Sequence, residues 1–143
     1  MKKLILFILI PFFIACSDDD SNNNAGSFLD EYNGVIWLED DNDENYDYWL
    51  IFTPNDASGG ERWYDTCDTW YSEWGVPSDG VSMDVVENSS NRLVVSVIED
   101  GDFGEVSYSA TFTVSNDGNT LTATYSDEPG YSETYSRSNN SPC

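Results

Sequence analysis

Strict alternation of apolar and hydroxyl side chains over residues 105–115 constrains the fold of this chain more than any other feature. Successive side chains of a strand point to opposite faces, so a period of two gives one apolar and one polar face. The segment Asn116-Asp117-Gly118-Asn119 follows, and such residues tolerate the positive φ of tight hairpin turns. We therefore expect a half-buried strand that leads into a hairpin. Its predicted inner face comprises Val106, Tyr108, Ala110, Phe112 and Val114.

The same pattern extends in both directions. Residues 120–125 and 131–137 alternate around a turn at Glu128-Pro129-Gly130, which predicts a three-stranded meander. The last strand should carry Tyr131, Glu133, Tyr135 and Arg137 on one face. Upstream, we predict strands at 35–39 and 46–53, a bent β segment at 62–73, and a hairpin of 82–87 with 92–98. No segment carries a convincing helical stripe.

These segments predict an all-β domain of about eight strands at hairpin spacing. We expect a small antiparallel up-and-down β-barrel, because closure removes unpaired strand edges; a β-sandwich is the alternative. A barrel that crosses a membrane needs an apolar outer surface with aromatic girdles. Here one face of the best strands is Ser, Thr and Glu, so an apolar interior and a polar outside are expected.

The first fifteen residues have the pattern of a targeting segment. Lys2 and Lys3 precede an apolar run from Leu4 to Ile14, and the small residue Ala15 comes before Cys16. The run is about half as long as the roughly twenty residues that a spanning helix needs. It therefore predicts a secretory signal peptide at residues 1–15.

The segment Phe13-Ile14-Ala15-Cys16 resembles the cleavage site of bacterial lipoproteins, whose peptidase cuts before an acylated cysteine. The resemblance implies lipidation of Cys16, and several acyl chains would anchor the protein durably. An ordinary signal peptide with a chance cysteine is the alternative. The following Ser17-Asp18-Asp19-Asp20 resembles the export signal of Bacteroidetes lipoproteins that reach the cell surface, so an outer-membrane, surface-exposed location is implied. Residues 16–27 would then form an acidic, disordered tether, on which three aspartates also favour solvation.

The net charge of the protein limits the kinds of partner that it can bind. Removal of residues 1–15 takes away both lysines and leaves three arginines against 27 acidic residues, a net charge of −24. Such a chain repels nucleic acid, whose binding requires cations to neutralise phosphates. Cations, basic proteins and uncharged ligands are the partners that it favours, although like-charge repulsion that keeps a monomer soluble explains the same composition.

Residues 28–143 form one domain of ordinary size. Aromatic residues make up 15% of the chain, which argues for a folded core despite the acidity. Cys67 and Cys143 remain after Cys16, and an oxidising compartment would allow a disulfide between them. Closing a loop of roughly seventy-seven residues would stabilise the fold by roughly 4 kcal/mol. Two free thiols are the alternative.

Four features together resemble the lipocalin-like lipoproteins of Bacteroidetes: the cysteine expected to be lipidated, the short tether, an early Gly34-Val35-Ile36-Trp37 and the final meander. The resemblance covers most of residues 30–137 and implies a barrel that binds a ligand. In that family an early tryptophan packs under a late arginine. It therefore implies contact between Trp37 and Arg137, which the preference of Arg for Trp faces supports.

The sequence gives little support for a catalytic function. The chain has no histidine, so neither an ordinary triad base nor an imidazole metal ligand exists. Glycoside hydrolysis needs a pair of acidic residues, but a chain with 27 acidic residues contains such pairs whether or not it is a hydrolase. The loop at 41–45 offers oxygen ligands for calcium, but Tyr46 and Phe52 stand where an EF-hand needs glycine and a bidentate acid. A solvated loop is favoured, and we expect no enzyme, cofactor or metal site.

Residues 62–74 are the candidate ligand site, because five aromatic residues lie on both faces of an extended segment and cannot all enter one core. Flat rings with polar tips suit a small hydrophobic or sugar-like ligand. Plain packing is the alternative. A second hypothesis for function is an acidic interaction or inhibitor module that binds a basic secreted protein. The candidate ligand-binding residues are Trp63, Tyr64, Trp70, Tyr71 and Trp74.

Overall fold

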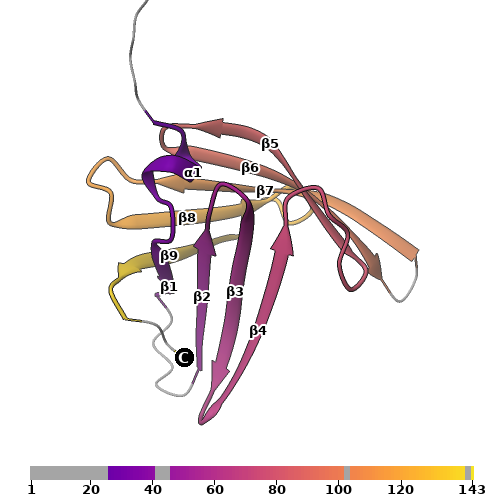
Figure 1. Ribbon diagram of the computed structural model, residues 1–143, viewed down its shortest axis with the longest axis horizontal. Coiled ribbons are helices and arrows are strands. Elements are labelled where there is room, and N and C mark those ends of the chain that lie inside the picture. Colours follow the sequence, from indigo (N-terminus) through magenta and orange to yellow (C-terminus); the bar gives the residue numbers. More distant parts are fainter. Residues whose placement is uncertain (1–25, 41–45, 102–103, 141–142) are drawn as a thin grey trace, which may run out of the picture.

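The computed structural model describes residues 26–40, 46–101, 104–140 and 143. This part of the chain is almost entirely β-structure (Figure 1). Its elements are the one-turn helix α1 (Phe28–Glu31) and the strands β1 (Ile36–Glu39), β2 (Tyr46–Phe52), β3 (Asp56–Trp63), β4 (Thr66–Glu73), β5 (Val81–Ser89), β6 (Arg92–Gly101), β7 (Gly104–Val114), β8 (Thr120–Tyr125) and β9 (Ser132–Ser138).

All nine strands belong to one antiparallel sheet with the order β4-β3-β2-β1-β9-β8-β7-β6-β5. Each strand pairs with its sequence neighbours except β4 and β5, and the pairing of β1 with β9 joins the first four strands to the last five. Figure 1 shows β2 to β4 running across the direction of β5 to β8, so the sheet curls strongly. The result is a nearly closed up-and-down barrel of the lipocalin-like type. The predicted architecture is thus confirmed, with nine strands.

The barrel is left open between β4 and β5. Within the described part of the chain these two edge strands do not pair with each other, and residues 74–80 connect them. In an ordinary meander the first and last strands form the edges, whereas here they meet in the middle of the sheet. The opening therefore lies beside the aromatic segment at 62–74.

The alternation predicted for residues 105–115 is present in the second half of β7, whereas Val106, which was predicted on the inner face, is 42% exposed. Ala110, Phe112 and Val114 are buried, and the intervening threonines are partly exposed. The predicted turn follows, with Gly118 at φ 73°. The backbone N–H of Asn119 donates to the Asp117 carboxylate at 3.2 Å, which fixes the turn.

The prediction of one bent β segment at 62–73 is wrong. Two strands, β3 and β4, meet there in a tight turn at Tyr64 and Asp65. Tyr64 adopts φ 53°, a left-handed conformation that is uncommon for an aromatic residue. No glycine or asparagine marks the turn, and β3 also begins six residues earlier than predicted, at Asp56, because Gly59 and Gly60 suggest a loop rather than a strand.

Helix α1 closes one end of the barrel, and its single turn was not predicted. Ser27, at the end of the predicted tether, accepts a hydrogen bond from the Asp30 backbone and caps the helix. The Leu29 N–H donates to the Asn88 side chain at the β5–β6 turn, at 3.1 Å. Phe28 is fully buried, and its ring lies 5.8 Å from that of Phe52. The aromatic core at this end therefore seals the barrel.

Several predictions concern other parts of the chain. The signal peptide, Cys16, most of the tether and the acidic loop at 41–45 lie outside the described residues. Within the described part, none of the helices is long and apolar enough to span a membrane.

Candidate ligand-binding site

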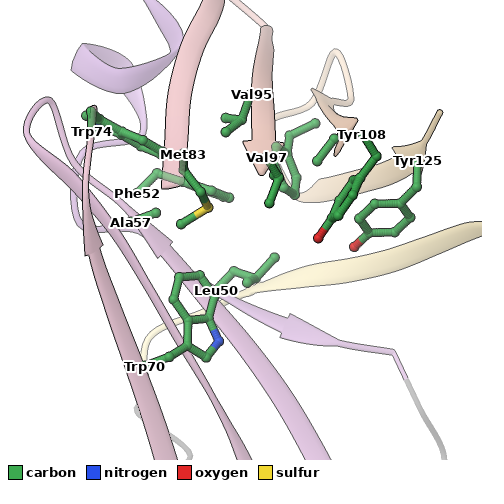
Figure 2. A pocket seen from close by; sticks show the side chains of 12 residues that line it. Leu50, Phe52, Ala57, Trp70, Trp74, Met83, Val95, Val97, Tyr108 and Tyr125 are labelled. Atoms are coloured by element: carbon green, nitrogen blue, oxygen red, sulfur yellow. The ribbon is translucent and has the colours of Figure 1, made fainter. Parts of the chain in front are cut away.

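The barrel encloses an apolar cavity of about 150 Å³ (Figure 2). Side chains of β2 to β8 and of the β4–β5 connection form its wall, and aromatic and aliphatic groups dominate it. In Figure 2, Tyr108 and Tyr125 lie on one side of this space, while Leu50 and Trp70 lie on the other. The lining comprises Leu50, Phe52, Ala57, Trp70, Trp74, Met83, Val95, Val97, Tyr108, Ala110, Phe112 and Tyr125.

Two of the five predicted ligand residues line this cavity. Trp70 projects from β4 over the backbone of Gly59, its partner on β3. Trp74 follows β4, and its indole N–H donates to the Thr53 carbonyl at 3.0 Å. That bond satisfies the polar group of Trp74 and leaves its ring as an apolar wall.

Tyr71 lies beside the cavity rather than in it. It lines a larger hollow of about 640 Å³ at the opening between β4 and β5, which we call the β4–β5 cleft. Trp70, Met83, Val97 and Tyr108 border both the cleft and the apolar cavity. The cleft therefore gives the cavity an approach from solvent along the edge of β4.

Trp63 and Tyr64 lie elsewhere, at the tip of the β3–β4 hairpin. They are 49% and 60% exposed and line neither hollow. Their rings lie 5.2 Å apart, and Trp63 also contacts Tyr46 at 5.3 Å. With Tyr48, which lies 4.7 Å from Tyr46, these residues form a separate aromatic cluster. The five predicted residues are thus divided between two regions, because the turn at Tyr64 reverses the chain direction.

A third hollow adjoins the cavity at Tyr108 and Tyr125. It has a volume of about 320 Å³ and is bordered by four acidic side chains and three tyrosines, and we call it the acidic cleft. Tyr108 and Tyr125 form part of the wall of both the acidic cleft and the apolar cavity. The lining of the acidic cleft comprises Glu99, Tyr108, Tyr125, Asp127, Glu128, Tyr131 and Glu133.

Glu133 organises the acidic cleft. Its Oε2 accepts hydrogen bonds from the hydroxyls of Tyr125 at 2.6 Å and Tyr135 at 2.7 Å. Its Oε1 accepts a longer bond of 3.3 Å from Tyr131. Three hydroxyl groups from β8, β9 and the turn between them therefore hold one carboxylate in place. Hydrogen bonds to a charged acceptor are stronger than neutral ones.

The tyrosines of this region are held in their neutral form. Burial, followed by hydrogen bonding to Glu133, raises the pKa of Tyr125 and of Tyr135 far above the ordinary value of 10.0. Burial and then the charges of Glu99 and Asp127 raise the pKa of Tyr108. In each case the phenolate would be a second negative charge beside carboxylates or in an apolar site, which is unfavourable.

The predicted disulfide is present between Cys67 and Cys143, whose Cα atoms lie 6.1 Å apart. It ties the end of the chain to the start of β4. Trp37 and Arg137 lie directly opposite each other on β1 and β9. Trp37 is fully buried, its ring is 5.8 Å from that of Tyr32, and the charge of Arg137 acts on the Tyr32 hydroxyl. The register brings the pair together, and stacking of the two side chains stays a prediction.

The residue pattern did not single out Tyr108, Tyr125 or Glu133 as site residues. Each was assigned to an alternating strand, and Tyr108 was placed on its inner face. The sequence signal that could have identified them is their position where the inner face of a strand changes from apolar to polar side chains. Along the inner face of β6, Leu93, Val95 and Val97 lead to Glu99, and the neighbouring strands change in the same direction.

Among the described residues, no group of three or more acidic, cysteine or histidine side chains is arranged to hold a metal ion. Comparisons of the chain with models of protein families, with curated proteins and with solved structures find no match. The geometry of the barrel and its hollows is therefore the basis for a functional assignment.

Proposed function

We propose that this protein is a lipid-anchored binding protein whose barrel takes up a small hydrophobic or sugar-like ligand. The apolar cavity between Trp70 and Tyr108 is the observation that carries this proposal. A cavity of about 150 Å³ lined by apolar groups has room for a group about the size of benzene. The adjoining β4–β5 cleft of about 640 Å³ provides room for a larger portion of the ligand.

The lining supports uptake of an apolar or ring-shaped group. Trp70, Trp74 and Phe112 supply flat faces, and Met83 supplies a flexible thioether that adapts to irregular shapes. Trp70 is 44% exposed although it lies beside the cavity, so part of its ring is available to a ligand in the cleft. An entirely structural tryptophan would be covered by its own protein.

Native mass spectrometry of the purified full-length protein tests the proposal. We expect a co-purified small molecule, and we expect Trp70→Ala to lose it because the substitution removes one wall of the cavity. Trp63→Ala is the matched control, since it removes an exposed tryptophan from the same hairpin without touching the cavity. Equal retention by both variants, or no ligand and no binding of added benzene, contradicts the proposal.

Anchoring is a separate part of the proposal. The lipoprotein-like segment before Cys16 supports acylation there and a position on the outer surface of the outer membrane. Labelling of cells with a fatty-acid probe should tag the wild-type protein and leave Cys16→Ser untagged. Added protease should then cleave the protein on intact cells; absence of label, or protection of the protein from protease, would argue against this part.

A second candidate is the binding of a basic secreted protein, which the net charge of −24 without residues 1–15 favours. Pull-down with a panel of basic proteins distinguishes the two candidates. Salt-sensitive capture that Trp70→Ala leaves unchanged would support this candidate over a cavity ligand.

A further inference from the structure

We infer that the ligand of the proposed site is an organic cation, whose apolar group enters the cavity while its ammonium group lies in the acidic cleft against Tyr108, Tyr125 and Tyr131. The inference rests on the proposed function, because it assigns the chemical class of the molecule that the barrel takes up. Three features support it: the adjacency of the two hollows, the charge of the acidic cleft, and the rings that border the cleft.

The cavity and the acidic cleft lie next to each other along the inner face of the sheet. On β6, Val97 borders the cavity and Glu99, two residues farther along the same face, borders the acidic cleft. Tyr108 pairs in register with Val97 and, together with Tyr125, forms part of both walls. A ligand with its apolar end beside Val97 and its other end past Tyr108 would place that other end near Glu99. The required ligand is polar at one end only.

The acidic cleft has no positive charge to balance its carboxylates. Lysine and arginine are absent from the described residues that line it. The arginines of the described part lie elsewhere: Arg62 pairs with Asp47, Arg92 pairs with Glu87, and Arg137 lies opposite Trp37. Among the described residues, the side-chain carboxylates of Glu99, Asp127 and Glu128 have no hydrogen-bond or ion-pair partner. The resulting negative potential attracts a cation and repels an anion.

The rings of the acidic cleft offer faces that an ammonium group can contact. The ring centroids of Tyr108 and Tyr125 lie 6.4 Å apart, and those of Tyr125 and Tyr131 lie 6.5 Å apart. A cation within about 6 Å of a ring centroid is attracted by the negative face of the ring, and cages of aromatic rings recognise quaternary ammonium groups in this way. The hydroxyls of Tyr125 and Tyr131 are directed to Glu133, which fixes their positions.

The Tyr108 hydroxyl is a further contact for the ligand. The side chain is half-buried, and among the described residues its hydroxyl has no hydrogen-bond partner. Figure 2 shows this hydroxyl pointing in the same direction as that of Tyr125, which donates to Glu133. Burial and the charges of Glu99 and Asp127 keep the phenol neutral. Tyr108 can therefore donate to or accept from a polar group next to the ammonium without adding charge.

A pair of isosteric probes tests the inference. Benzyltrimethylammonium and neopentylbenzene have the same shape, and only the first carries a positive charge. Both would be titrated into the full chain carrying Cys16→Ser, so that no acyl chain competes for the cavity. We expect the cation to bind about tenfold or more tightly than the neutral probe. Its advantage should shrink toward about 1 M NaCl, where the screening length falls to about 3 Å.

Paired variants locate the charge effect. Glu99→Gln combined with Asp127→Asn should lower the affinity for the cation about tenfold and leave the affinity for the neutral probe within about twofold. Glu31→Gln combined with Asp65→Asn is the matched control, because it removes the same charge from exposed residues that line none of the three hollows. This control should change neither affinity.

The outcomes separate the inference from the proposed function. Equal binding of both probes, or binding of the neutral probe alone, would overturn the inference and leave a cavity that takes apolar ligands. Equal losses of affinity for the cation in the two paired variants would also overturn the inference, because the loss would then follow from the net charge of the protein. If neither probe binds, both the inference and the proposed ligand site are wrong.

Discussion

Gly59 of β3 lies directly opposite Trp70 of β4, and the indole of Trp70 covers the Gly59 backbone. A Cβ atom at position 59 would lie 2.6 Å from Cε2 of Trp70 and 2.8 Å from the carbonyl oxygen of Trp49. Both distances are far inside van der Waals contact, so any other residue would displace the ring or the backbone. The absence of a side chain at position 59 thus sets the position of a cavity wall.

Gly59→Ala should therefore destabilise the protein. We expect the free energy of unfolding to fall by about 1–3 kcal/mol, because the added methyl group overpacks the site. Urea unfolding followed by tryptophan fluorescence measures this change. Gly26→Ala is the control, since a Cβ there lies 3.9 Å from its nearest neighbour, in ordinary contact. Equal stability of the two variants would mean that Trp70 does not occupy the space over Gly59.

Substitutions at two buried alanines distinguish an empty cavity from a packed core. Ala110 lines the cavity, whereas Ala123 is fully buried and does not. Ala110→Leu should fill the cavity, abolish benzene binding, and change the free energy of unfolding by less than about 1.5 kcal/mol. Ala123→Leu should cost about 1–3 kcal/mol, since no free volume receives the added carbons. Calorimetric titration measures the binding of benzene, and urea unfolding measures the stability. A larger loss of stability in Ala110→Leu than in Ala123→Leu would show that the space beside Ala110 is filled.

The disulfide should contribute a large share of the stability. Cys67 and Cys143 are separated by 76 positions, so the bridge restricts most of the unfolded domain. We expect Cys143→Ser to lower the free energy of unfolding by about 4 kcal/mol. Combining it with Cys67→Ser should add little, because either substitution alone removes the bridge. Urea unfolding of the three variants measures this, and additive losses would contradict a bridge between these two cysteines.

Stability should decline in alkaline solution because of the tyrosines around Glu133. The pKa values of Tyr125 and Tyr135 are raised by burial and by Glu133, whereas in the unfolded chain these groups ionise near 10.0. The unfolded state therefore releases protons first as the pH rises, so the stabilisation is complete below pH 10 and is lost above it.

Unfolding in urea at pH values between about 8 and about 11 measures this decline. Tyr125→Phe should cost about 1 kcal/mol at neutral pH through the lost hydrogen bond, and should make the alkaline decline shallower. Tyr64→Phe is the control, because Tyr64 is exposed and makes no hydrogen bond to Glu133. A decline of unchanged slope in Tyr125→Phe would contradict the assignment.

The alternating pattern was enough to predict the strands that form the closed wall of the barrel. In β7 and β8 the inner side chains are apolar and the outer ones carry hydroxyls, so only one register buries the apolar face. The pattern was insufficient for β3, where Gly59 and Gly60 suggest a loop. Those glycines are required by Trp70 and Trp49, which come from neighbouring strands, and a local pattern carries no information about such contacts.

The candidate site was predicted only in part for the same reason. Residues 62–74 contain Trp70 and Tyr71, which border the hollows, but also Trp63 and Tyr64, which do not. Which aromatic residues face the cavity depends on where the chain turns, and Tyr64 turns it in a conformation that its side chain does not favour. Tyr108 and Glu133 come from distant strands that the sheet register brings together.

The sequence by itself determined the class of this protein: an all-β domain with an apolar interior and a strongly acidic surface, with a disulfide possible between Cys67 and Cys143. Side-chain period, turn residues and composition are local properties, and they suffice for that level of description. Only the tertiary structure decided that the barrel opens between β4 and β5 and that an apolar cavity adjoins an acidic, tyrosine-lined cleft. Those features depend on strand pairing and sheet curvature, which are set by contacts between residues far apart in the chain.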